Sequence, residues 1–430
     1  MKAAFHYAFI FLFLLLNINI NQAFGLGWTE EERNHADSFT SKIKDPFIIT
    51  LKTYSEDPAF VLPKNRKTKI RKHFVSSSYF KDGKIPYLLG EVKGDKETRP
   101  LAIFIPGTFS KLFSQITKDF HLRLVRLGYR VVSFENLFYH DAIKRGPLFN
   151  LFNTEKQAKV YFDAAQRIHT KLLDEGKVNN QVTLLGQSYG GFLASVMFNQ
   201  ETAQLSKKKA HFFNGGLHIY SPPFNFARSI ELFDEILLEA KKNKTFGSFP
   251  KYVLTHFEIN KIDYEFEISE DLRRRALPLF VDYGFKTYME KTLEAIEKVR
   301  VKNILPKMKK EKKEFFKNLS FGEAFSLMDT EAFNHFKRSE EKLLVYWIKK
   351  AIQKGRDNIR ILTSLDDMIN DEVDPELVNS PHMLIIPNGG HFGYRQMPWF
   401  DKLLIKSLKL NKTTDLNDLK LALFQTQEDQ

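Results

Sequence analysis

The sequence predicts an α/β protein in which helices cover both faces of a mostly parallel sheet and a helical cap is inserted between two strands. Short apolar runs alternate with helical segments from Leu101 to Tyr220, which is typical of a parallel sheet. The alternation stops between residues 224 and 355, where the sequence is charged, helix-forming and rich in aromatic residues. It resumes at Ile359–Thr363 and Met383–Ile386, so we expect the helical block to be an insertion into one sheet.

We expect six segments along the 430 residues. They are a signal peptide over 1–23, an N-terminal extension over 24–73, the first part of the core over 74–222, the helical cap over 223–355, the second part of the core over 356–410, and a polar tail over 411–430.

The core is expected to open with a hairpin followed by a buried strand. Strand-like runs at Val75–Phe80 and Tyr87–Val92 flank Asp82-Gly83, a dipeptide typical of tight hairpin turns. Leu101–Ile105 is a continuous apolar run that ends at Pro106-Gly107. Such a run is expected of a central strand that is buried on both faces.

Helices and strands then alternate. A helix is expected over Phe113–Leu127, because Gly128 follows it as a stop signal. Apolar residues recur at helical spacing between Thr154 and Gly176, which predicts a longer helix. The remaining expected elements are strands at Arg130–Phe134, Val182–Leu185 and Gly216–Tyr220, a helix from residue 191 to about 199, and a closing amphipathic helix over Pro398–Leu408.

The first residues predict export. Lys2 precedes an apolar stretch from Ala4 to Leu16 that is interrupted only by His6. This stretch has the length of a signal-peptide core and is shorter than the ~20 residues that span a bilayer. Cleavage after Ala23 would release the chain into a periplasmic or extracellular space. An uncleaved membrane tether is the alternative interpretation.

Composition limits the classes of partner and of chemistry. The net charge of +13 favours anionic partners, but no nucleic-acid-binding motif accompanies it, and we expect no nucleic-acid partner. The basic run Lys64–Lys72 is expected to be solvated surface, with peripheral contact to an anionic membrane as the alternative.

The absence of cysteine excludes disulfides, thiol nucleophiles and thiolate metal sites. The 41 phenylalanines are expected in the core, and an apolar substrate pocket is a second use for them.

A G-x-S-x-G motif follows one of the expected strands. In Gly186-Gln187-Ser188-Tyr189-Gly190 the serine lies where a strand turns sharply into a helix, and Gly186 and Gly190 relieve the crowding of that turn. The hydroxyl of Ser188 is thereby exposed as a candidate nucleophile. A serine hydroxyl needs a base, and the base needs an acid that orients it.

The base and the acid are expected late in the chain. His391 lies in Asn388-Gly389-Gly390-His391-Phe392-Gly393, directly after the last expected strand. The preceding strand ends in Asp366-Asp367. Asp367 best fits the position of the acid, with Asp366 as the alternative.

The tetrahedral intermediate needs backbone N–H donors, which we expect from Tyr189 and from Thr108, with Phe109 as the alternative to Thr108.

These motifs resemble those of the α/β-hydrolase superfamily over roughly Val75 to Leu410. The order serine, acid, histidine along the chain is the order found in that superfamily. The resemblance implies an α/β-hydrolase fold and a two-step acyl transfer, with Ser188 as nucleophile, His391 as base and Asp367 as orienting acid. It implies no metal and no organic cofactor.

The substrate is less strongly indicated than the reaction. A carboxylic ester, such as a lipid or acylglycerol ester, is the broadest expectation and implies a lipase-like serine esterase. Candidates to line an apolar pocket are Phe224, Phe226, Leu232 and Phe233, with ordinary helix packing as the alternative.

Two alternative functions remain open at the level of the sequence. A serine aminopeptidase of the same fold would use cap carboxylates to hold the amino terminus of its substrate, and the candidates are Asp263, Glu265, Glu267, Glu270 and Asp271. A non-catalytic binding protein on this scaffold would be expected to lack a member of the triad, and none is missing.

Overall fold

The chain forms one mixed sheet of eight strands in the order β1-β2-β4-β3-β5-β6-β7-β8. The computed structural model describes residues 28–30, 32–34, 36, 45, 47, 50 and 68–408, the last range apart from 109, 201–210, 243–268, 285–287, 300–304, 372 and 397. The strands are β1 (Thr68–Ser76), β2 (Lys84–Val92), β3 (Arg99–Ile105), β4 (Arg130–Phe134), β5 (Val178–Gln187), β6 (Leu217–Tyr220), β7 (Ile359–Ser364) and β8 (Met383–Ile386). The pairs β1–β2 and β2–β4 are antiparallel, and all the others are parallel.

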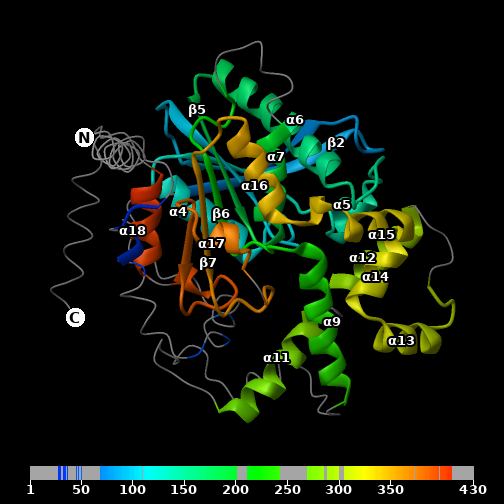
Figure 1. The fold of residues 1–430 in the computed structure, drawn as a ribbon. Coiled ribbons are helices and arrows are strands. Elements are labelled where there is room, and N and C mark those ends of the chain that lie inside the picture. Colours follow the sequence, from blue (N-terminus) through cyan, green and yellow to red (C-terminus); the bar gives the residue numbers. More distant parts are fainter. Residues whose placement is uncertain are drawn as a thin grey trace, which may run out of the picture.

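Helices cover both faces of the sheet (Figure 1). One face packs on α6 (Thr154–Asp174), α7 (Tyr189–Gln200) and α16 (Leu344–Gln353), and the other on α4 (Gln115–Arg126) and α18 (Pro398–Ser407). Strand β3 shows why the run Leu101–Ile105 is apolar: Leu101, Ile103 and Ile105 face the first set of helices, whereas Ala102 and Phe104 face the second. Alternate side chains of a strand point to opposite faces, so a strand covered on both sides favours apolar residues at successive positions.

The described residues between β6 and β7 are helical, as expected of an inserted cap. The helices are α9 (Phe226–Lys242), α11 (Glu270–Gly284), α12 (Glu290–Val299), α13 (Lys309–Asn318), α14 (Phe321–Met328), α15 (Thr330–Arg338), the 3-10 helix Glu340–Lys342, and α16. In Figure 1 α9 and α11 extend beyond the edge of the sheet, whereas α16 lies beside α7. The Asn199 side chain donates to the Trp347 carbonyl over 2.7 Å, so α16 belongs to the layer that covers the sheet. Further helices are α5 (His140–Lys144), α17 (Pro375–Val378) and the 3-10 helix Gly393–Gln396.

The expected start of the core at residue 74 is wrong. Strand β1 begins at Thr68 and pairs with β2 from Thr68↔Val92 to Ser76↔Lys84, so part of the basic run lies within a strand and the expected strand at Val75–Phe80 is displaced. An edge strand has one hydrogen-bonded neighbour, and charged side chains are common there. Arg71 and Lys72 are accordingly exposed. Such a strand lacks the apolar alternation by which a strand is recognised in a sequence.

Two terminal expectations lie outside the described residues, namely the signal peptide over 1–23 and the tail over 411–430. Export and membrane contact therefore stay predictions. Within the described parts of the chain, no helix is both long enough and apolar enough to cross a bilayer.

Candidate active site

Ser188 occupies a strained turn between β5 and α7. Its φ is +54°, in the left-handed region that costs a residue with a Cβ about 1–2 kcal/mol. The Ser188 N–H donates to the Tyr220 carbonyl at the end of β6, over 2.9 Å. The neighbouring strand therefore fixes the backbone of the turn, and Ser188 sits at the N-terminus of α7.

Gly186 and Gly190 lie so close to neighbouring main chain that neither position has space for a side chain. A Cβ on Gly190 would lie 2.2 Å from the Ile105 carbonyl oxygen and 2.3 Å from that of Pro106. A Cβ on Gly186 would lie 2.4 Å from the Gly190 carbonyl oxygen. Both glycines are thus required by close packing of main chain against main chain.

The structure brings the three expected triad residues together. His391 Nε2 lies 3.2 Å from Ser188 Oγ, and His391 Nδ1 lies 2.9 Å and 3.2 Å from the two carboxylate oxygens of Asp367. The Asp367 side chain is fully buried, whereas that of His391 retains 11% exposure. The imidazole therefore bridges an inaccessible carboxylate and a serine hydroxyl.

Asp366 has a different set of partners. Its carboxylate accepts hydrogen bonds from the backbone N–H groups of Gly389 (3.0 Å) and Gly390 (2.8 Å). Burial raises the pKa of Asp366 above its usual value. Asp366 thus holds the loop that carries His391, while Asp367 contacts the imidazole itself.

Two serines that sequence reasoning missed also hold the histidine loop. The Ser221 hydroxyl accepts from the Phe392 N–H over 3.1 Å. The Ser364 hydroxyl donates to the Gly390 carbonyl over 2.8 Å. Ser221 follows β6 and Ser364 ends β7, so both lie at the carboxyl edge of the parallel sheet. Their position directly at the ends of two expected strands is the only feature of the sequence that could have indicated this role.

The turn expected to supply an oxyanion donor lies directly against the nucleophile. A Cβ on Gly107 would meet Ser188 Cβ at 3.0 Å and Ser188 Oγ at 3.4 Å. Thr108 follows Gly107 in this turn, and Tyr189 is the first residue of α7. One expected donor therefore belongs to the residue after Ser188, and the other to the turn that packs on Ser188. Phe109 lies outside the described residues.

Aromatic side chains connect the nucleophile turn to the cap. The Tyr189 ring lies 5.4 Å from that of Phe138 and 4.6 Å from that of Phe226. Phe226, at the start of α9, also contacts Phe325 of α14 and Phe336 of α15. Of the four residues proposed to line a pocket, Phe226 thus packs on Tyr189, the residue after the nucleophile, whereas Phe233 packs on Phe321.

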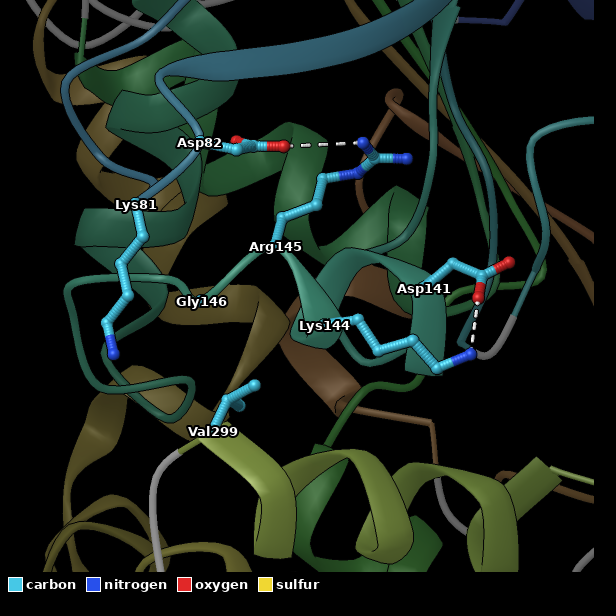
Figure 2. A pocket seen from close by; sticks show the side chains of 7 residues that line it. All are labelled: Lys81, Asp82, Asp141, Lys144, Arg145, Gly146 and Val299. Atoms are coloured by element: carbon cyan, nitrogen blue, oxygen red, sulfur yellow. Dashed lines mark hydrogen bonds and ion pairs between the residues drawn. The ribbon is translucent and has the colours of Figure 1, made fainter.

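The cavity shown in Figure 2 is separate from this arrangement. It has a volume of about 560 Å³ and is lined by Lys81, Asp82, Asp141, Lys144, Arg145, Gly146 and Val299. Arg145 pairs with Asp82 at 3.5 Å, and Lys144 pairs with Asp141 at 2.9 Å. No expected site residue lines this cavity, and we assign it no part in the chemistry.

Glu135 is a buried acid beside the turn that carries Thr108. It directly follows β4, and its side chain accepts a hydrogen bond from the Leu112 N–H. Burial raises the pKa of Glu135 to about 7, with smaller effects from Arg145, Asp141 and Lys72. The next residue, Asn136, donates through its side chain to the Pro106 carbonyl over 3.3 Å.

Replacing Gly190 by alanine should destabilise the protein. The added Cβ would overlap backbone oxygens of Ile105 and Pro106 that cannot move independently of the sheet, so we expect a loss of about 2 kcal/mol or more in the free energy of unfolding. Gly284→Ala is the control, because a Cβ there meets nothing within 4 Å, and its effect should stay below about 1 kcal/mol. Urea unfolding compares the two variants, and equal losses would contradict the packing described here.

Glu135 should make stability depend on pH. Because its pKa in the folded state is raised from 4.5 to about 7, the folded chain retains a proton that the unfolded chain has released between those pH values. Native stability should therefore fall as the pH rises through this window, by up to about 3 kcal/mol. Glu135→Gln removes this loss, so its advantage over the native protein should grow between pH 5 and pH 8. Exposed Glu239 on α9 supplies the control, and a Glu135→Gln profile parallel to that of Glu239→Gln would disprove the assignment.

Comparisons with known proteins find likeness only among solved structures. No family model matches the chain, and no curated protein sequence matches it. Brefeldin A esterase, described as a bacterial homologue of human hormone sensitive lipase, is 11% identical with a TM-score of 0.42, covering 88% of this chain and 86% of the esterase. An esterase from Pyrobaculum calidifontis is 14% identical with a TM-score of 0.39, covering 91% and 96%. The acylaminoacyl peptidase of Pyrococcus horikoshii is 11% identical with a TM-score of 0.42, covering 83% of this chain and 44% of the peptidase.

The classification of the fold therefore depends on the chain itself. A mostly parallel sheet carries an antiparallel β2 and a helical insertion after β6, and the predicted fold class is confirmed. A serine at positive φ joins β5 to α7 and meets a histidine from the loop after β8 and an aspartate from the loop after β7. This chain has the α/β-hydrolase fold.

Proposed function

We propose that the protein is a serine hydrolase that cleaves carboxylic esters through an acyl-enzyme on Ser188. The observation that carries the proposal is the continuous hydrogen-bonded path from the buried Asp367 carboxylate through His391 to Ser188 Oγ. A serine held this way has the base and the orienting acid that nucleophilic catalysis requires.

In the acylation step, His391 Nε2 takes the proton of Ser188 Oγ as the oxygen attacks the carbonyl carbon of the ester. The new Oγ–C bond gives a tetrahedral intermediate, and the imidazolium is stabilised by Asp367. Collapse of the intermediate breaks the bond to the alcohol oxygen. His391 returns its proton to that oxygen, and the alcohol leaves.

The negative charge of the intermediate would be met by backbone donors. We assign this role to the N–H groups of Tyr189 and Thr108, because Tyr189 begins a helix at the nucleophile and Gly107 packs on Ser188. Donors that are part of a rigid turn need no rearrangement as the charge develops.

Deacylation repeats the chemistry with water. His391 removes a proton from water as the water oxygen attacks the acyl carbon, and a second tetrahedral intermediate forms. Its collapse breaks the bond to Ser188 Oγ, which recovers its proton from His391. The products are the free acid and the regenerated serine.

The surroundings favour an ester with an apolar acyl group over an aminoacyl peptide. In the described residues, the Tyr189 ring of the nucleophile turn packs on Phe226 of the cap, which in turn packs on Phe325. Several described cap carboxylates hold helix ends: Asp234 accepts from the N–H groups of Phe321 and Gly322, and Asp329 caps α15. The carboxylates proposed for a peptidase, Asp263, Glu265 and Glu267, lie outside the described residues, and the structure does not describe the side chains of Glu270 and Asp271. An aminopeptidase therefore remains the second candidate.

The two adjacent aspartates test the mechanism. Asp367→Asn should lower kcat about a thousandfold or more, because the imidazole loses the partner that sets its tautomer and stabilises its charged form. Asp366→Asn keeps an oxygen acceptor for the histidine loop, so it should lower kcat only about tenfold. Rates are measured with nitrophenyl esters of two to twelve acyl carbons, and with aminoacyl nitroanilides.

The native enzyme should hydrolyse medium-chain nitrophenyl esters faster than the two-carbon ester and faster than the aminoacyl nitroanilides. A larger loss in Asp366→Asn than in Asp367→Asn would reverse the assignment of the acid. Preference for the nitroanilides would move the aminopeptidase to first place.

A further inference from the structure

The N-terminal extension contacts the site, although the sequence assigned it no role. The Thr50 hydroxyl accepts a hydrogen bond from the backbone N–H of His391 over 2.9 Å. Thr50 itself is fully buried. A residue that precedes the whole sheet in the chain is thus bonded to the residue that faces Ser188.

The extension is attached to the core at its beginning. The Trp28 backbone N–H donates to the Pro381 carbonyl over 2.8 Å, and its indole N–H donates to the Ile361 carbonyl over 3.0 Å. Trp28 is 5% exposed and packs in the same cluster as residues of β7 and β8. These strands lead into the loops that carry Asp367 and His391, so Trp28 is anchored on the strands that build the site.

A second contact of the extension involves the cap. Phe47 is buried, and its ring meets Phe280 of α11 edge-on, with the centroids 6.3 Å apart. Buried Asp45 accepts from the Phe47 N–H over 3.0 Å, which fixes the local turn. Phe47 and Thr50 are helical and three residues apart, a spacing that places side chains on one face of a helix. Phe47 therefore contacts the cap, and Thr50 contacts the histidine loop.

The Thr50 contact completes a set of side-chain restraints on that loop. Asp366 binds the N–H groups of Gly389 and Gly390, Ser364 binds the Gly390 carbonyl, and Ser221 binds the Phe392 N–H. Thr50 binds the N–H of His391, the residue in the middle. Buried backbone donors need partners, and a reacting group must be held to within about 0.5 Å of its productive position.

We propose that Thr50 is a positioning residue for His391, and that the N-terminal extension is thereby an integral part of the active site. The inference rests on the proposed serine-hydrolase function. Loss of the Thr50 hydroxyl would leave the His391 N–H without this acceptor, so the loop would relax and the 3.2 Å separation of Nε2 and Ser188 Oγ would change. The effect should fall on the chemical step more than on substrate binding.

The experiment compares Thr50→Val with Thr50→Ser in the full-length chain. Valine matches the shape of threonine without an acceptor, whereas serine keeps the hydroxyl. Thr50→Val should lower kcat for a nitrophenyl ester about tenfold with KM changed less than about twofold, and Thr50→Ser should restore kcat to within about twofold of native. Thr183→Val is the matched control, because Thr183 is equally buried and lies five residues before Ser188 in β5.

Each outcome bears on one claim. If Thr50→Val is folded and has the native kcat, the positioning role is overturned. It is also overturned if Thr50→Ser is as slow as Thr50→Val, or if Thr183→Val shows the same loss of kcat at the same loss of stability. A native protein that hydrolyses no ester and no aminoacyl amide would instead overturn the proposed function.

Discussion

The conformation of Ser188 is the constraint on which the rest of the site depends. A serine at a φ of +54° between a strand and a helix is strained, and it keeps this conformation only if the neighbouring backbone restrains it. The backbone bond from Ser188 to Tyr220 fixes one side of the turn, and the carbonyls of Ile105 and Pro106 close on Gly190 from the other. Three adjacent strands, β3, β5 and β6, thus define where the hydroxyl lies. The buried, two-sided sheet supplies the rigidity that this arrangement requires.

The histidine loop is positioned in a different way. Its residues belong to no strand and no α-helix, and side chains from distant parts of the chain bind its backbone groups one by one. Phe392, which follows His391, has a φ of +63° and stacks on Phe120 of α4 at 5.7 Å. Further along, Arg395 pairs with Asp119, and Arg123 pairs with Asp119 and Asp401, all with fully buried side chains. Removal of one member of such a cluster leaves a buried charge unpaired, so this end of the loop is anchored by charge as well as by packing.

Much of this was predictable from sequence because the relevant signals are local. Most of strand β3, Leu101–Ile105, is a continuous apolar run, and the motif around Ser188 lies at the end of β5. The order of serine, aspartate and histidine can be read directly from the sequence. The start of β1 was not predictable, since an edge strand carries exposed basic residues and lacks apolar alternation. Thr50 was not predictable either, because its partner is a backbone N–H far along the chain and nothing about a lone threonine marks that contact. The sequence placed Asp367 before Asp366 as the acid, and the coordinates were needed to separate the two, because both residues lie in the loop after β7 and only their partners differ.

The role of Ser188 as nucleophile is tested most directly by reaction of the native protein with a fluorophosphonate, followed by peptide mass spectrometry. A serine hydroxyl reacts rapidly with this reagent only when a base has activated it. We expect one adduct per chain, located on Ser188, and no adduct in a folded Ser188→Ala variant. A folded native protein that stays unlabelled, or one labelled equally in the Ser188→Ala variant, would contradict the assignment of Ser188 as the nucleophile.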